Sequence, residues 1–289
     1  MSLPPARPSP DVSPADWPAP PPGGRVAVSL RGRLFVGWMI ALGGIYLAIV
    51  VALLVGGLTY MDFSRFWETV SSPDILFAMR LSLLSSLTTV ALALVIGIPA
   101  GYVLSRYRFP GKLIIDTLLD IPIVLPPLVV GVLLLIFFHT AAGRWIKANV
   151  NDPVFQPEGV VLAQFVVACA FGIRMIKATF DQIDPRLESV ARTLGATRSQ
   201  AFFRVTLPMA RSGVLAAAVV TWARAIGEFG PILIFGGTMR GHTEVLPTSI
   251  WLELQVGDIQ AALAVTLLMI LLAMTTLLLF KRFGGQIRL

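Results

Sequence analysis

The chain has little charge. Asp, Glu, Lys and Arg make up only 13% of its 289 residues, whereas 56% are hydrophobic. A soluble domain usually carries about a quarter charged residues, so this deficit excludes an ordinary soluble protein and indicates a membrane protein. The single cysteine, Cys169, excludes an intramolecular disulfide framework.

Groups that carry chemistry are also scarce. Only two histidines occur, His139 and His242, and neither belongs to an H-E-x-x-H motif. No G-x-S-x-G turn offers a serine nucleophile. Asp116 and Asp120 lack a partner nearby in sequence, and we expect them to cap a helix or hydrogen-bond near the membrane interface. These absences argue against an intramembrane enzyme. The sequence therefore offers no candidate catalytic residues and no candidate set of metal ligands.

A phosphate-binding loop of the form G-x-x-x-x-G-K-[ST] is missing as well. The one Gly-Lys pair, Gly111–Lys112, continues into leucine and isoleucine. Any ATP that serves this protein must therefore be bound by another chain. The net charge of +7 comes with no RNA- or DNA-binding motif, so we attribute it to basic loops that fix membrane topology and expect no nucleic acid partner.

What the sequence does contain is a proline-rich start followed by long apolar runs. The first 22 positions hold nine prolines, and we expect residues 1–33 to form a disordered tail without a signal peptide. A membrane span needs about 20 mostly apolar residues. Residues 34–289 contain six such segments and predict an all-α membrane protein. The segments are about 35–58, 80–104, 113–138, 159–178, 213–236 and 258–280.

The third segment contains Pro122, Pro126 and Pro127, which we expect to kink or break it. Lys and Arg set the orientation, because cytoplasmic loops carry an excess of them. Seventeen lie in the tail, the second and fourth loops and the C-terminus, against four in the opposite loops. Both termini are therefore predicted to be cytoplasmic. No inverted repeat is visible, which argues against a secondary transporter.

The long cytoplasmic loop, 184–208, reads DPRLESVARTLGATRSQAFFRVTLP and predicts two short helices. Asp184 can cap the first, with Pro185 at its first position. Gly195 fits the left-handed residue that ends a helix. The local chemistry therefore predicts a helix from about Pro185 to just before Gly195.

The second helix begins at a capping box, in which Thr197 caps the helix and Gln200 reaches back. We expect it to end by Pro208 and to form an L-shaped pair with the first. On physical grounds alone, such a pair could be a generic amphipathic connector that lies on anionic lipid headgroups.

The loop also resembles the coupling loop of ABC-importer permease subunits, whose pattern is Glu-Ala-Ala, a glycine, nine residues, then Ile-x-Leu-Pro. Here Gly195 is followed by nine residues and then Val-Thr-Leu-Pro, while Glu188 stands seven residues before the glycine rather than the more common six. The resemblance implies that the loop docks on a cytoplasmic ATPase subunit, which binds ATP and Mg, and transmits its motion to the spans. The residues implied in this coupling are Glu188, Ala191, Gly195, Arg198, Phe202, Val205, Leu207 and Pro208.

A charged pair interrupts the predicted fifth span, in WARAIGEFGP, 222–231. Arg224 and Glu228 are four residues apart, so we expect them to share one face of the helix, with Pro231 bending it just beyond. Two interpretations stay open. The pair can neutralise itself and lock the helix against a neighbour, as intramembrane ion pairs do, or it can offer a cation to a passing oxyanion. The second assigns Arg224, Gly227, Glu228 and Phe229 to the translocation path or gate.

This segment resembles the signature of permeases in the sulfate/molybdate/tungstate branch of ABC importers. The stretch with RFPG and IPIVLPPLVVG is similar to the first core of molybdate permeases, and the similar regions cover about residues 75–280. The resemblance implies alternating access for an oxyanion, molybdate or tungstate before sulfate or thiosulfate. It also implies a second permease subunit, expected to be an identical chain, an extracytoplasmic binding protein, and a bacterial or archaeal inner membrane. An ATP-independent secondary transporter or channel is the alternative from another class.

Overall fold

A computed structural model of the protein describes residues 30–284, so the predicted tail lies outside the described residues up to position 29. The chain divides into two units, 1–56 and 57–289. The first unit contains most of α1 (Leu30–Tyr60). This helix begins at Leu30, inside the stretch 1–33 that the sequence assigned to the tail. Its Leu34–Tyr60 portion is long and apolar enough to cross a membrane.

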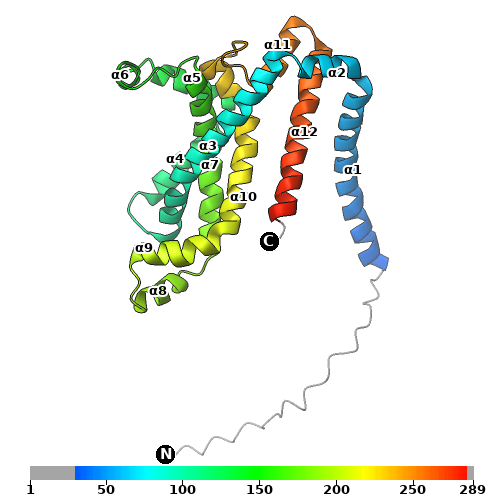
Figure 1. The fold of residues 1–289 in the computed structure, drawn as a ribbon. Helices are drawn as coiled ribbons and strands as arrows, with labels where there is room; N and C mark the ends of the chain where they lie inside the picture. Colours follow the sequence, from blue (N-terminus) through cyan, green and yellow to red (C-terminus); the bar gives the residue numbers. More distant parts are fainter. Residues whose placement is uncertain (1–29, 285–289) are drawn as a thin grey trace, which may run out of the picture. The chain divides into compact units, whose positions relative to one another are not determined.

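The second unit holds the other long helices, which are α3 (Pro73–Arg106), α7 (Pro157–Asp181), α10 (Leu207–Ile226) and α12 (Ile259–Gly284). α3 packs along α7, and α10 packs against both (Figure 1). By length and hydropathy, residues 30–284 contain five helices able to cross a membrane, or six if one bent pair counts as a single span. Three short helices, α2 (Phe63–Val70), α6 (Ala141–Asn149) and α11 (Leu246–Val256), connect them.

The bent pair is the predicted third span. α4 (Lys112–Val124) and α5 (Pro127–Phe137) meet at an angle of 113°. Consecutive prolines explain the break, because neither Pro126 nor Pro127 has an N–H to donate and each disfavours helical geometry in the residue before it. Leu125 and Pro126 are accordingly extended. Pro122, in contrast, lies inside α4 without ending it.

Small and hydroxyl-bearing side chains let the central helices approach closely. A Cβ on Gly101 of α3 would lie only 2.9 Å from Ile176 Cγ2 of α7. The hydroxyl of Thr89, also on α3, donates to Gln164 Oε1 at 3.1 Å, and both residues are buried. Such packing is typical of helices in lipid, where small residues and interhelical hydrogen bonds replace the hydrophobic drive of water.

The fifth span differs from its prediction at both ends. α9 (Arg198–Ala201) continues through a π-helical turn, η2 (Phe202–Thr206), into α10, so the expected stop at Leu207–Pro208 is wrong. Pro208 has no N–H, and the chain accommodates the gap by widening the turn: Leu207 N–H donates to the carbonyl of Phe202, five residues back. In Figure 1, α9 lies crosswise to α10, so the turn between them is a bend without a break.

At its other end α10 stops at Ile226, and a second π-helical turn, η3 (Ile232–Gly236), follows. The expectation that Pro231 merely bends the helix is therefore wrong. A proline clashes with the carbonyl four residues before it, which here belongs to Gly227, and glycine is itself a poor helix former. The helix consequently ends at this glycine.

Candidate coupling loop and charged sites

The local chemistry of the loop 184–208 forms as predicted at Gly195 and at the capping box, but its first helix begins one residue later than predicted. Pro185 lies at the N-cap of α8 (Arg186–Thr193) rather than at its first position, and the Asp184 carboxylate, one residue before the cap, accepts the Arg186 N–H at 2.9 Å. Gly195 has φ of +92°, the left-handed conformation that glycine tolerates best. Thr197 and Gln200 form both bonds of the capping box at the start of α9. Figure 1 places α8 and α9 at one end of α7 and α10, away from α2, α6 and α11.

Glu188 ties this loop to the bundle. Its Oε2 accepts the Tyr102 hydroxyl at 2.8 Å, and its Oε1 accepts both Arg106 Nε at 3.0 Å and the Thr206 hydroxyl at 2.7 Å. Arg106 also donates to the carbonyl of Ile183 at 2.8 Å. One carboxylate thereby joins α8 to the last turns of α3 and to η2. We call these contacts of Glu188 with Tyr102, Arg106 and Thr206 the latch.

The latch is largely withdrawn from solvent, with the side chains of Arg106 and Glu188 8% and 14% exposed. Burial by itself would raise the pKa of Glu188. The hydrogen bonds from Thr206, Tyr102 and Arg106, together with the Arg106 charge, outweigh burial and hold this pKa below its ordinary value. Glu188 is therefore ionised at neutral pH.

The other predicted coupling residues fall into two groups. Phe202 points inward, and its ring centroid lies 4.6 Å from that of Tyr102, while Ala191, Val205 and Leu207 are half-buried. Gly195, Arg198 and Pro208 are exposed. The loop also exposes an apolar surface, which we call the outer face. It consists of Leu187 and Val190 on α8, Leu194 directly after that helix, and Phe203 on η2.

The charged pair of the fifth span forms, but not on one helix as predicted. Arg224 lies in the last turn of α10, whereas Glu228 follows the helix end at Gly227. The two side chains still make an ion pair, with Nη1 and Oε2 2.6 Å apart. Glu228 is fully buried and Arg224 is 29% exposed, with its guanidinium 5.6 Å from the ring centroid of Phe171 on α7.

The two glycines near the pair differ in their surroundings. Gly227 is exposed, and Phe229, next to Glu228, is half-buried with its ring 6.1 Å from that of Trp251. A Cβ on Gly230 would lie 2.8 Å from the backbone nitrogen of Leu128. Gly230 therefore allows a close approach to α5 within this chain.

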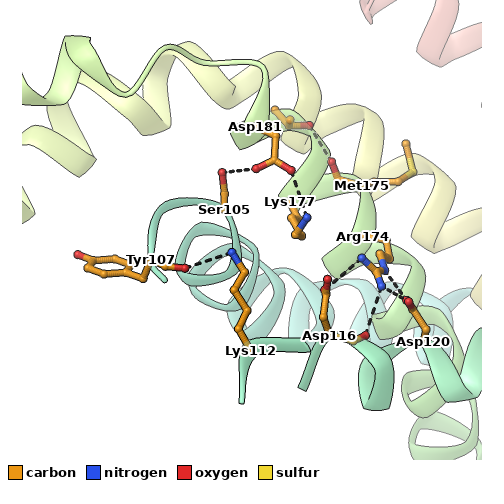
Figure 2. A network of polar contacts seen from close by, with 10 residues as sticks. Ser105, Tyr107, Lys112, Asp116, Asp120, Arg174, Met175, Lys177 and Asp181 are labelled. Carbon is orange, nitrogen blue, oxygen red and sulfur yellow. Dashed lines mark hydrogen bonds and ion pairs between the residues drawn. The ribbon is translucent and has the colours of Figure 1, made fainter. Parts of the chain in front are cut away.

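Asp116 and Asp120 have a partner that the sequence did not reveal. Both carboxylates of α4 face Arg174 of α7, which pairs with Asp116 at 3.1 Å and forks onto both oxygens of Asp120 (Figure 2). Of the two roles expected from the sequence, the structure shows hydrogen bonding rather than helix capping, and the partner lies 54 residues away from Asp120 in the sequence. The cluster fastens α4 to α7. Beside it, Asp181 accepts Ser105 Oγ at 2.6 Å and Lys177 Nζ at 3.2 Å.

This arrangement is that of a polytopic helical membrane protein in which the loop 184–208 forms a helix pair held against the bundle. The family described as binding-protein-dependent transport system inner membrane component matches residues 93–288. The chain belongs to this family.

Among its relatives, the sulfate transport system permease protein CysT of Escherichia coli is 31% identical over 275 residues, which cover 90% of this chain and 98% of that protein. The molybdate/tungstate transport system permease protein WtpB of Thermococcus kodakarensis is 41% identical over 173 residues, 60% of this chain and 66% of that protein. A chain of the bacterial alginate ABC transporter, solved with an alginate-bound periplasmic protein, superposes with a TM-score of 0.71 at 20% identity. It covers 87% of this chain and 95% of its own length, and at this identity the likeness shows the fold alone.

Proposed function

We propose that the chain is the membrane subunit of an ATP-driven importer of a tetrahedral oxyanion, with molybdate or tungstate as the cargo. The loop 184–208 carries this proposal, because it combines the coupling-loop register of Gly195 to Pro208 with the latch that fixes α8 to α3 and to η2. The sequence contains no phosphate loop of its own, so a partner ATPase binds ATP and Mg.

The latch and the continuous α9–η2–α10 run supply a mechanical path. A force on α8 reaches α3 through the Glu188–Arg106 pair and reaches η2 through the Glu188–Thr206 bond. α10 then extends without a break from η2 through Arg224 to Ile226, a length of about 30 Å for its 20 residues. Nucleotide-driven motion at the loop is thereby delivered to the charged pair, which we assign to the gate of an alternating-access cycle.

The outer face offers the contact surface for the ATPase. Exposed Val190, Leu194 and Phe203 lie among exposed arginines, a composition typical of protein interfaces. We propose that this loop is cytoplasmic, because α2 and α6, which carry Arg65, Arg144 and Lys147 of the lysine- and arginine-poor loops, lie at the opposite end of the second unit. The excess of lysine and arginine in the tail, the second and fourth loops and the C-terminus supports a cytoplasmic position for both termini as well. The complete importer has two permease subunits, proposed to be identical chains, and an extracytoplasmic binding protein.

The choice of anion rests on the relatives. WtpB supports molybdate or tungstate by its higher identity, and CysT supports sulfate by its longer coverage, so sulfate or thiosulfate is the alternative cargo. Calorimetry of the cognate binding protein with molybdate, tungstate and sulfate separates these cargoes.

Transport itself is tested in proteoliposomes that contain the full-length chain, its co-purified ATPase and the binding protein. We expect uptake that requires both ATP and the binding protein. Uptake without any ATPase would instead establish a secondary transporter or channel and overturn the proposal.

A further inference from the structure

A cavity of about 190 Å³ lies between α8, α9 and the end of α3. Three arginines line it from three different elements: Arg106 from α3, Arg192 from α8 and Arg198 from α9. Tyr102, Tyr107 and Ser189 are further polar residues in its lining. Arg192 and Arg198 stand on opposite sides of the Gly195 turn, so a group in the cavity would touch both arms of the loop.

The cavity has an excess of positive charge. Glu188 is the one carboxylate in its lining, and the latch already engages both of its oxygens, with Arg106 neutralising its charge. Neither Arg192 nor Arg198 has a carboxylate partner among residues 30–284. Two arginines without a carboxylate partner therefore line one small concave space, an arrangement that favours an anion with several acceptor oxygens.

The shape of α8 separates this cavity from the surface proposed for the ATPase. Pro185, Glu188, Ser189 and Arg192 line the cavity, at the helical spacing of one face. Leu187, Val190 and Leu194 recur on another face, and these are the exposed apolar side chains. A protein docked on the outer face would thus leave the cavity to a small group.

We propose that this cavity binds a tetrahedral phosphate-type oxyanion, held by Arg192 and Arg198 across the Gly195 turn. The group can be the headgroup phosphate of an anionic phospholipid, since basic pockets at the cytoplasmic membrane surface bind such headgroups, or a free oxyanion from the cytoplasm. Only the lipid source rests on the proposed cytoplasmic placement of the loop. By bridging the two arms, the anion stiffens the element that transmits the motion.

Two measurements on the full-length chain test the site and distinguish the sources. In detergent, calorimetry is performed with inorganic phosphate, sulfate and molybdate. In nanodiscs, retained lipid is counted by native mass spectrometry with phosphatidylglycerol against phosphatidylcholine. Arg192→Gln and Arg198→Gln each remove one guanidinium, and Arg186→Gln and Arg204→Gln are matched controls, because both arginines are exposed on the same loop but do not line the cavity.

We expect anion binding in at least one of the two measurements. Either cavity variant should weaken this binding about tenfold or more, and either control should leave it unchanged. Binding of free anions alone identifies a soluble ligand, and selective retention of phosphatidylglycerol alone identifies a lipid. No binding in either measurement, or an equal loss of affinity in all four variants, overturns the proposal. Because neither measurement uses ATP or transport, that result would leave the proposed function standing, whereas a failure of uptake would not affect this site.

Discussion

The guanidinium of Arg106 and the carboxylate of Glu188 form a 3.0 Å ion pair that joins the last turn of α3 to the first helix of the loop, 82 residues further along the chain. Removing one partner of a nearly buried pair leaves the other desolvated and unpaired. We therefore expect the attachment of the loop to α3 to depend strongly on the carboxylate of Glu188.

Glu188→Gln keeps the shape of the side chain but removes its charge. We expect a loss of about 1.5–3 kcal/mol in stability, because three hydrogen bonds to an ionised acceptor are weakened, and a fall in uptake per ATP hydrolysed as the loop loosens from α3. Thermal unfolding in detergent and the transport-to-hydrolysis ratio in proteoliposomes measure these effects. Glu158→Gln, at an exposed glutamate on α7, is the control, and equal behaviour of the two variants would show that the latch contributes nothing.

The latch also makes stability depend on pH. The pKa of Glu188 is lower in the folded protein than in the unfolded chain, so its ionised form stabilises the fold above the ordinary glutamate pKa of about 4.3, and that contribution is lost as pH falls through the lowered value. The difference in melting temperature between the wild type and Glu188→Gln should therefore be full at pH 7 and shrink as the pH falls below about 4.3. A constant difference from pH 7 to pH 3 would contradict this prediction.

Arg174 holds two carboxylates of α4. Arg174→Gln leaves Asp116 and Asp120 facing each other without a cation, so we expect α4 to loosen from α7. Hydrogen–deuterium exchange should show faster exchange over residues 112–124 than in the wild type. Adding Asp116→Asn and Asp120→Asn to Arg174→Gln should restore slow exchange, because the repulsion is removed. Unchanged exchange in the single variant would show that apolar contacts alone hold α4.

Variants of the Arg224–Glu228 pair distinguish a role in the translocation path or gate from a purely structural role. Arg224→Gln strands the fully buried Glu228, so we expect lower yield of folded protein, and the double variant Arg224→Gln/Glu228→Gln should recover it. If the pair belongs to the gate, the double variant stays folded but loses uptake, measured with radiolabelled molybdate. A double variant with full uptake would leave the pair a purely structural role.

Because α3 packs closely on α7, we expect a side chain added between the two helices to destabilise the fold. A Cβ added in Gly101→Ala would meet both Ile176 Cγ2 at 2.9 Å and the backbone nitrogen of Lys177 at 3.0 Å. The fixed backbone cannot yield, so we expect a loss of about 1–3 kcal/mol. Gly97→Ala is the matched comparison, since its new Cβ meets only the tip of Ile176 at 3.1 Å among close contacts. A larger loss in thermal stability for Gly97→Ala than for Gly101→Ala would reverse the predicted order.

Sequence reasoning was most reliable where the cause is local. The capping box of Thr197 and Gln200 and the left-handed Gly195 form because each residue acts on backbone groups within a few positions. The end of α10 was missed although a local signal existed: Gly227 lies four residues before Pro231, where proline excludes a continuing helix.

By itself, then, the sequence determined that the chain is an all-helical membrane protein, where its long apolar segments lie, and how Gly195 and the Thr197–Gln200 capping box shape the loop 184–208. Hydropathy and capping depend on residue type and short spacing, which a linear chain displays. Only the tertiary structure decided that Glu188 faces inward to Arg106, that Arg174 takes Asp116 and Asp120, and that Arg192 and Arg198 share a cavity. These partners belong to different helices or to the two sides of a turn, and their pairing is set by how the helices pack, for which one sequence carries no local signal.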